Sequence, residues 1–396
     1  MIVTVTPNPA LDLTWHVAAL QPGSTHRADT GQARAGGKGV NVARVAHAEG
    51  ASACAVVTHG GATGEEFFAE LVASGVPHVT VPVHGATRRS IALVDETAGD
   101  TTIVNERGAA LEEVEWDVLR RVTRAALAAG RAAGLGEKPA RLLSSRARDL
   151  AERTARSREE PVHPARYRAL DGMGGAGFSS GKTAVPGAGV LVISGSFPPD
   201  TPDDVLPSLI GLGRNAGATV IVDTSGPALL AAADAGASVL KPNEHELRDA
   251  TGLDDPVDGA RELIRRGAEL VLLSLGADGM LAVTPTASGD VHVLHARLGE
   301  VLAGNPTGAG DAAVAACAVL MDAGIHDPEQ ILRRATAWSA AAVLMPLAGE
   351  IHPSWPELES ALTFAEKPLP ARDTRTGEVS HVEADVSPAS DPKETR

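Results

Sequence analysis

The segment TGAGDAAVAACAVLMDAG, residues 307–324, predicts a helix that begins at a ligand site. Gly308 and Gly310 let the backbone approach a ligand, and a small-sided helix over residues 312–323 follows and ends at Gly324. The amides of Gly308, Ala309 and Gly310 would then face outward at the positive end of that helix, where anions bind. Fixed amides stabilise a phosphoryl group in transfer, and Asp311 is placed to take a proton from an attacking hydroxyl. An ordinary turn with an N-capping aspartate explains the segment alone equally well.

The rest of the chain predicts an α/β fold with a mostly parallel sheet flanked by helices. Short apolar strands alternate with helices, which is typical of parallel βαβ units. Two stretches, about residues 12–33 and 88–106, instead read as alternating strands and a hairpin. They predict a small separate sheet that forms a lid over the open end of the core. The predicted core strands are 2–6, 53–58, 190–194, 219–223, 238–241 and 270–274, and the predicted helices are 40–49, 65–73, 203–215, 227–235, 244–251 and 258–266.

Two regions depart from the pattern of the predicted domain, which spans residues 1–364. Residues 131–188 carry eleven Lys and Arg against six Asp and Glu, with few large apolar side chains, which indicates a flexible or loosely docked insertion. Residues 365–396 are charged and rich in Pro and Ser, and are expected to be a disordered tail.

The insertion contains AGFSSGKTAV, residues 176–185, which resembles a phosphate-binding P-loop. A P-loop needs a buried strand before it and a helix after it. No strand pattern precedes this segment, and Pro186 and Gly187 would end a helix within a turn. We interpret the match as chance, and a P-loop NTPase as the weaker alternative.

Composition limits the function classes. The 396 residues are 43% hydrophobic, enough for a large core, and carry a net charge of −15, which argues against a nucleic-acid binder. Two cysteines form no disulfide framework or zinc motif. The N-terminus lacks a basic leader and no apolar run of about 20 residues occurs, so no membrane span is expected and a cytoplasmic protein is the default.

Other segments supply candidate ligand groups. In KPNEHEL, residues 241–247, Asn243 and Glu246 fall on one helical face after a strand, where oxygen ligands suit a water-rich Mg²⁺ site. Taken alone, that segment is more simply explained by a helix cap with a capping-box glutamate. In RAGGKGVN, residues 34–41, Lys38 and Asn41 open a helix after a glycine loop. Together with the cations of TRRS, residues 87–90, this suggests phosphorylated ligands, although a lone Lys or Arg is more often a solvated charge.

Taken together, these segments resemble the PfkB/ribokinase-like carbohydrate kinases, in the branch of 1-phosphofructokinases and tagatose-6-phosphate kinases. TPNPALD, GGKGVN, TRRS, SGSFP, KPNEHEL, SLGADG and TGAGD occur in the family's order across residues 2–364. The resemblance implies a ribokinase-like doubly wound core, a β-sheet lid, and pairing of two copies through the lids. Ser90 stands where this branch often has Asn, so the resemblance leaves the sugar open.

The resemblance also implies the site. Asp311 would be the catalytic base beside the anion hole of Gly308, Ala309 and Gly310. Ser274 and Gly276 would line the ATP site, and Asn243 and Glu246 would organise Mg²⁺ through water. The groups expected around the sugar and its phosphate are Asp12, Gly37, Lys38, Asn41 and Arg88.

The expected reaction is ATP- and Mg²⁺-dependent phosphorylation of a ketohexose monophosphate, with fructose 1-phosphate preferred. Tagatose 6-phosphate, fructose 6-phosphate or an unphosphorylated sugar would keep the chemistry and change the acceptor. A non-catalytic sugar-phosphate sensor on the same fold is the alternative of another class, although a sensor would have little use for Asp311 as a base. Neither nucleic acid nor membrane is expected as a partner.

Overall fold

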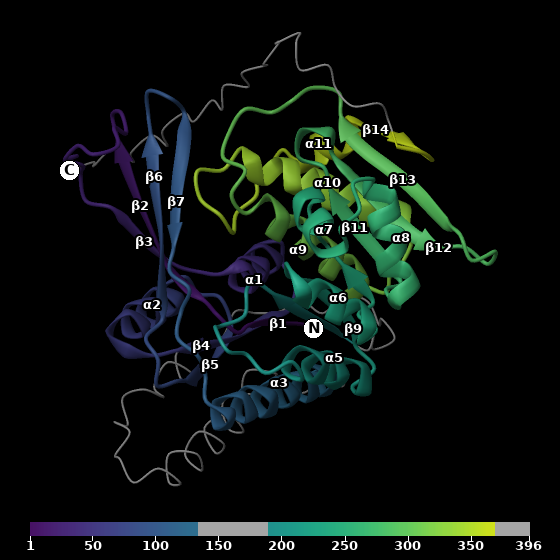
Figure 1. Ribbon diagram of the computed structural model, residues 1–396, viewed down its shortest axis with the longest axis horizontal. Helices are drawn as coiled ribbons and strands as arrows, with labels where there is room; N and C mark the ends of the chain where they lie inside the picture. The colour runs from purple at the N-terminus through teal and green to yellow at the C-terminus, as the bar shows by residue number, and fades with distance from the viewer. Residues whose placement is uncertain (134–188, 369–396) are drawn as a thin grey trace, which may run out of the picture.

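A ten-stranded sheet forms the centre of the computed structural model, which describes residues 1–133 and 189–368 (Figure 1). Its strand order is β14-β13-β12-β11-β10-β9-β8-β1-β4-β5, parallel from β11 to β5 and antiparallel from β11 to β14. These strands are β1 (Ile2–Thr6), β4 (Ala53–His59), β5 (His78–Pro82), β8 (Val190–Ser194), β9 (Thr219–Asp223), β10 (Val239–Leu240), β11 (Leu270–Ser274), β12 (Met280–Pro285), β13 (Val291–Leu298) and β14 (Leu362–Ala365). The expected mostly parallel α/β sheet is confirmed.

Helices cover both faces of this sheet, because alternate side chains of each buried strand point to opposite faces. Ile2 belongs to the apolar cluster on one face and Val3 to the cluster on the other. The first face is covered by α1 (Lys38–Ala48), α2 (Gly61–Ala73), α9 (Ala309–Asp322) and α10 (Pro328–Val343). The second is covered by α3 (Glu113–Ala133), α5 (Val205–Asn215), α6 (Pro227–Asp234), α7 (Glu244–Thr251) and α8 (Pro256–Arg266); α11 (Trp355–Ser360) packs on α10.

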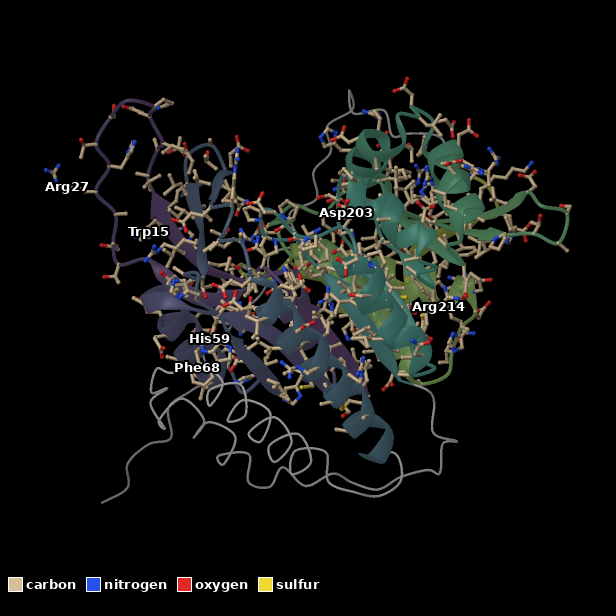
Figure 2. The ribbon with its side chains drawn as sticks, turned by 60° about the horizontal axis from the view of Figure 1, so that its bottom comes forward. Trp15, Arg27, His59, Phe68, Asp203 and Arg214 are labelled. Atoms are coloured by element: carbon tan, nitrogen blue, oxygen red, sulfur yellow. The ribbon has the colours of Figure 1, made fainter. Side chains whose placement is uncertain are left out.

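The lid is a separate four-stranded sheet with the order β3-β2-β6-β7 (Figure 1). It consists of β2 (Ala10–Val17), β3 (Gln32–Gly36), β6 (Arg88–Asp95) and β7 (Asp100–Asn105). The expected hairpin is β6–β7, and β2 pairs with β6 in parallel, a long-range contact that no local pattern signals. Figure 2 shows Trp15 and Arg27 on this side of the molecule, with Asp203 and Arg214 on the opposite side.

Three expectations lie wholly or largely outside the described residues: the insertion at 131–188, the P-loop-like segment within it, and the tail at 365–396. Within the described ranges, β14 runs to Ala365, and no helix is long and apolar enough to cross a bilayer. Helix α9 begins at Ala309, three residues before the predicted start, so Asp311 lies in its first turn.

Candidate active site

Asp311 is a buried carboxylate at the start of α9, with 6% of its surface exposed. Its Oδ2 accepts a hydrogen bond from Asn41 Nδ2 at 2.8 Å, and Asn41 lies in the first turns of α1. Burial and, after it, the charge of Asp223 raise the pKa of Asp311 to about 7, against the opposing effects of Lys38, Asn41 and Lys241. A carboxylate with a pKa near the working pH is suited to accept a proton.

Two lysines surround a second carboxylate, Asp223, at the end of β9. Lys38 Nζ lies 3.3 Å from Asp223 Oδ1, and Lys241 Nζ lies 3.6 Å from the same atom. Burial opposes ionisation of Asp223, but Lys241 and Lys38 outweigh it and hold its pKa below the usual value. Asp223 also raises the pKa of Lys38 and is the largest contributor to that shift. The charges of both lysines also lower the pKa of Asp311, so both act on that carboxylate.

The predicted anion hole lies at the same point. Gly308 is the N-cap of α9 with φ of 89°, a left-handed conformation, and a Cβ there would lie 2.8 Å from the Ala348 Cβ. A Cβ on Gly310 would lie 3.1 Å from Lys241 Nζ. Glycine at 308 therefore permits both the turn and its packing, and the Lys241 ammonium lies beside the amides of the first helical turn. A helix N-terminus with a neighbouring cation is suited to bind an anion.

The segment after β10 carries the predicted nucleotide and metal residues. Asn243 and Glu246 form a capping box: Asn243 Oδ1 accepts from Glu246 N at 2.8 Å, and Glu246 Oε2 accepts from Asn243 N at 2.9 Å. Glu246 Oε1 lies 3.7 Å from Lys38 Nζ. Asn243 pairs with Ser274 at the end of β11, and Gly276, with φ of 58°, follows in the 3₁₀ turn η2 (Gly276–Asp278). The helix cap and the predicted Mg²⁺ site are therefore compatible, because the cap uses Glu246 Oε2 and leaves Oε1 near Lys38.

The donor set fits Mg²⁺ only through water. In the described ranges, no group of three or more His, Cys, Asp or Glu side chains could hold a metal ion. Glu246 Oε1 is a carboxylate oxygen at the edge of the cluster, partly exposed, and Asn243 adds an amide oxygen already engaged in the cap. Mg²⁺ keeps several waters and binds through one or two carboxylates plus substrate phosphates, which matches this pair.

Asp12 lies on the lid strand β2, among three arginines. Burial raises its pKa to about 6, against the opposing charges of Arg88, Arg34 and Arg44 and a hydrogen bond from Ser90. Gly36 is close to Asp12 in the lid, and a Cβ at Gly36 would overlap the Asp12 carboxylate. The strand therefore needs glycine here to seat this side chain.

An ion pair and a hydrogen bond connect this arginine cluster to the core. Arg34 Nη2 lies 2.6 Å from Glu350 Oε1, and Arg44 Nη2 donates to Ala35 O at 2.9 Å. The backbone of Gly349 approaches Arg44 and Asn41 so closely that a Cβ would lie 3.0 Å from each of them. Asn41 therefore donates to Asp311 and lies close to the Gly349 backbone, which precedes the Glu350 partner of Arg34.

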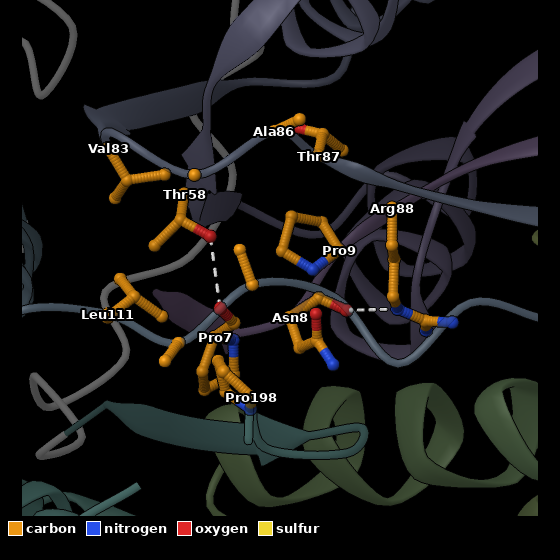
Figure 3. Close-up of a pocket in the computed structure, with 13 residues that line it drawn as sticks. Pro7, Asn8, Pro9, Thr58, Val83, Ala86, Thr87, Arg88, Leu111 and Pro198 are labelled. Carbon is orange, nitrogen blue, oxygen red and sulfur yellow. Dashed lines mark hydrogen bonds between the residues drawn. The ribbon is translucent and has the colours of Figure 1, made fainter. Parts of the chain in front are cut away.

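Arg88 opens β6 and lines a pocket at the base of the lid (Figure 3). Its Nε donates to Asn8 O at 3.2 Å. This pocket does not include Asp311 or Asp12, so it adjoins the predicted site rather than forming it. The lining residues are Pro7, Asn8, Pro9, Thr58, Val83, Gly85, Ala86, Thr87, Arg88, Ala109, Ala110, Leu111 and Pro198.

The predicted residues thus fall into two groups. The first group lies at the ends of the core strands and helices and consists of Lys38, Asn41, Asn243, Glu246, Ser274 and Gly308–Asp311. The second group, Asp12 and Arg88, lies on the lid. Gly37, the N-cap of α1 with φ of 106°, connects them. The sequence groups Lys38 with Arg88, but the ion pairs of Lys38 are with Asp223 and Glu246, and its role toward the sugar stays a prediction.

Sequence reasoning missed Asp223, Arg34, Arg44 and Glu350, and gave Lys241 no role. Lys241 opens the KPNEHEL segment and Arg34 opens RAGGKGVN, so both stand in quoted motifs. Asp223 has only one signal, an acidic residue at the carboxyl end of a buried strand, where ligands bind in open α/β sheets.

Comparison with known proteins shows relatives over most of the chain. The chain is 31% identical to the 1-phosphofructokinase of Xanthomonas campestris over 85% of its length and 89% of that protein, and 31% identical to the 1-phosphofructokinase of Haloferax volcanii over 92% and 96%. The structure matches phosphofructokinase-2 from Escherichia coli in complex with fructose-6-phosphate, with a TM-score of 0.68 and 26% identity over 91% of this chain and 98% of that one. The model of the pfkB family carbohydrate kinases matches residues 6–150 and 178–355, and the chain belongs to that family.

Proposed function

We propose that this kinase transfers the γ-phosphoryl group of ATP to the free primary hydroxyl of fructose 1-phosphate, giving fructose 1,6-bisphosphate. The observation that carries the proposal is the buried Asp311, with a pKa raised to about 7, at a glycine-rich helix start beside two lysines. That arrangement combines a base with a site for a developing negative charge. A sugar-phosphate sensor would need neither.

In this proposal, Asp311 accepts the proton of the attacking hydroxyl while Asn41 fixes its carboxylate by the 2.8 Å hydrogen bond. The amides of residues 308–310 and the Lys241 ammonium neutralise the phosphoryl oxygens. On the lid, Asp12 accepts from sugar hydroxyls, and Arg88 pairs with the phosphate already on the sugar. Holding the sugar at both ends brings its hydroxyl into line, and a lid that excludes water limits ATP hydrolysis.

Mg²⁺ bound to the ATP phosphates would supply charge neutralisation, and Glu246 with Asn243 would hold it through water. Ser274 and Gly276 would line the nucleotide site next to this pair, since Asn243 and Ser274 lie in register. The four assignments rest on position at the strand ends, where nucleotides bind in open α/β sheets.

A panel of acceptors tests the proposal, with ADP release measured on fructose 1-phosphate, fructose 6-phosphate, tagatose 6-phosphate and fructose. We expect the highest kcat/KM with fructose 1-phosphate, and a rise in its KM of about tenfold or more in Arg88→Ala. Arg89→Ala is the matched control, because successive strand side chains point to opposite faces. No ADP release with any sugar would favour the sensor instead.

Fructose 6-phosphate is the second candidate acceptor. The chain is 29% identical to the ATP-dependent 6-phosphofructokinase isozyme 2 of Mycobacterium tuberculosis over 87% of its length. Because both acceptors give the same bisphosphate, the decisive result is the ratio of the two kcat/KM values, not the product.

We also infer that two copies pair through their lids. Strand β7 lies at the edge of the lid sheet and is exposed along its length, with Ile103 at 45% and Val104 at 55% exposure. An unprotected edge strand is a template for pairing with a second chain. Light scattering should give the mass of an oligomer that Val104→Lys converts to monomer; an unchanged mass would rule out this surface.

A further inference from the structure

Asn8 lies where the lid is joined to the core, and no catalytic role has been assigned to it. It follows β1 in the loop that leads to the lid strand β2, and only 8% of it is exposed. Its Nδ2 donates to Arg107 O at 3.0 Å and to Ser196 Oγ at 3.2 Å. One side chain thus ties the entry to the lid to the segment that leaves it after β7, and to the loop after β8.

The backbone of Asn8 also holds Arg88. Arg88 Nε donates to Asn8 O at 3.2 Å, and its Nη1 donates to Glu106 O at 3.3 Å. Two carbonyls from two separate connections therefore fix the plane of the guanidinium, which still has further N–H donors. The residue before Arg88 is anchored as well, since Thr87 N donates to Gly60 O at 2.8 Å and Thr87 Oγ1 accepts from Gly60 N at 3.1 Å.

We propose that Asn8 is a positioning residue: it aims Arg88 at the phosphate already present on the sugar by locking together the connections that carry the lid. The inference rests on the proposed function, because it needs Arg88 to bind that phosphate. Asn8 itself does not touch the substrate in this account. It acts through the 3.2 Å contact between its carbonyl and Arg88 and through the amide that fixes the loop bearing this carbonyl.

The chemistry of the contacts explains why asparagine stands here. The Nδ2 group meets one carbonyl oxygen and one hydroxyl, so a donor is required, and an aspartate would place an acceptor against Arg107 O. Its Oδ1 faces Gly108, where a Cβ would overlap it and where φ is 85°. Glycine at 108 therefore lets the segment after β7 close over the Asn8 amide.

The test is a pair of Michaelis constants. Asn8→Ala should raise the KM for fructose 1-phosphate about fivefold to tenfold, the factor that one neutral hydrogen bond is worth, and leave the KM for ATP within about twofold. Ser196→Ala removes one of the two partners and should shift the same constant in the same direction by less. Thermal unfolding of each variant shows that the protein measured is folded.

Asn305→Ala is the matched control variant, in the segment that leads into α9. Asn305 Nδ2 donates to Pro346 O at 3.0 Å, and its Oδ1 accepts from Thr307 N at 3.0 Å, so it ties a loop in the same way beside the anion hole. We expect this variant to affect the ATP constant or kcat and not the sugar constant. A general loss of rigidity would raise both constants in both variants, and that result would overturn the proposal.

A double-mutant cycle separates the inference from the function on which it rests. If Asn8 acts through Arg88, the effect of Asn8→Ala on the sugar constant should disappear in an Arg88→Ala background. Additive effects would refute the coupling. If Arg88→Ala raises the KM for the sugar phosphate and Asn8→Ala does not, only the inference is wrong. If Arg88→Ala leaves that constant unchanged, the phosphate assignment of Arg88 fails first, and the inference fails with it.

Discussion

Replacing Asp311 by asparagine should make the protein more stable while removing its turnover. The pKa of Asp311 is raised by burial from 3.8 to about 7 in the folded chain. Between pH 3.8 and about pH 7, Asp311 has lost its proton in the unfolded chain but keeps it in the folded chain. The unfolding free energy of the wild type therefore falls as pH rises through this window. The difference of about three pKa units, at 1.36 kcal/mol each, sets an upper value of about 4 kcal/mol above pH 7.

The Asp311→Asn variant would carry no such penalty, because the new amide is neutral and can turn its oxygen to Asn41 Nδ2. Urea unfolding, followed by the fluorescence of buried Trp116 and Trp338, should therefore give equal stabilities near pH 4 and a more stable variant at pH 8. The kcat of the variant should fall by about 10² to 10⁴, the usual contribution of a general base.

The matched control is the same substitution at Asp223. Its folded pKa is lowered by Lys241 and Lys38 against the effect of burial, so its stabilisation is present above the unfolded pKa and is lost as pH falls through the folded value. Asp223→Asn should destabilise the protein at pH 7 by about 3–5 kcal/mol, the cost of breaking a buried ion pair. An Asp311→Asn variant no more stable than wild type at pH 8, or a stability difference that is the same at pH 5 and pH 8, would refute the raised pKa of Asp311.

Three further predictions concern the same site. Asn41→Ala removes a hydrogen bond that lowers the pKa of Asp311, so the acidic limb of the pH profile of kcat/KM should move up by about one pH unit. The sugar phosphate titrates alike in both enzymes, so an acidic limb that does not move would contradict the assignment of Asp311 as the base. Gly310→Ala places a Cβ 3.1 Å from Lys241 Nζ, and kcat should fall about tenfold with the melting temperature kept, because alanine is a good helix former. Glu246→Gln keeps a capping-box acceptor but loses the charge, so the Mg²⁺ concentration for half-maximal rate should rise about tenfold without a loss of thermal stability. A loss of thermal stability with no change in the Mg²⁺ requirement would show that Glu246 is only a cap.

The core of the fold was predictable because its signals are local. A buried parallel strand is a short apolar run, and the helices between such runs follow from their length and capping residues. The lid was predicted as a separate sheet but not in its strand order, since β2 and β6 pair in parallel with partners 78 positions apart, as in Ala10 and Arg88. No turn connects them, and neither strand alone specifies its partner.

The glycine-rich helix start of the site was predictable from the sequence, but the charged residues that surround it were not. Gly308 and Gly310 appear in the sequence as a backbone requirement, and they predicted the helix start at which Asp311 lies. The hydrogen bond from Asn41 to Asp311 joins residues 270 positions apart, and it exists because α1 and α9 lie side by side on one face of the sheet. Asp223 has no motif around it, and its partners come from α1 and from the end of β10.

Two buried carboxylates whose pKa values shift in opposite directions would let one site hold both a fixed anion and the proposed proton acceptor. Both are buried, so burial alone would raise both pKa values. Asp223 lies within 3.6 Å of two ammonium groups and stays ionised, and its retained charge then disfavours a second negative charge on Asp311. Two acids whose pKa values are shifted in opposite directions by their surroundings can take different roles. Asp223 therefore contributes to the raised pKa of Asp311, because its charge adds to the larger effect of burial and opposes the effects of Lys38 and Lys241.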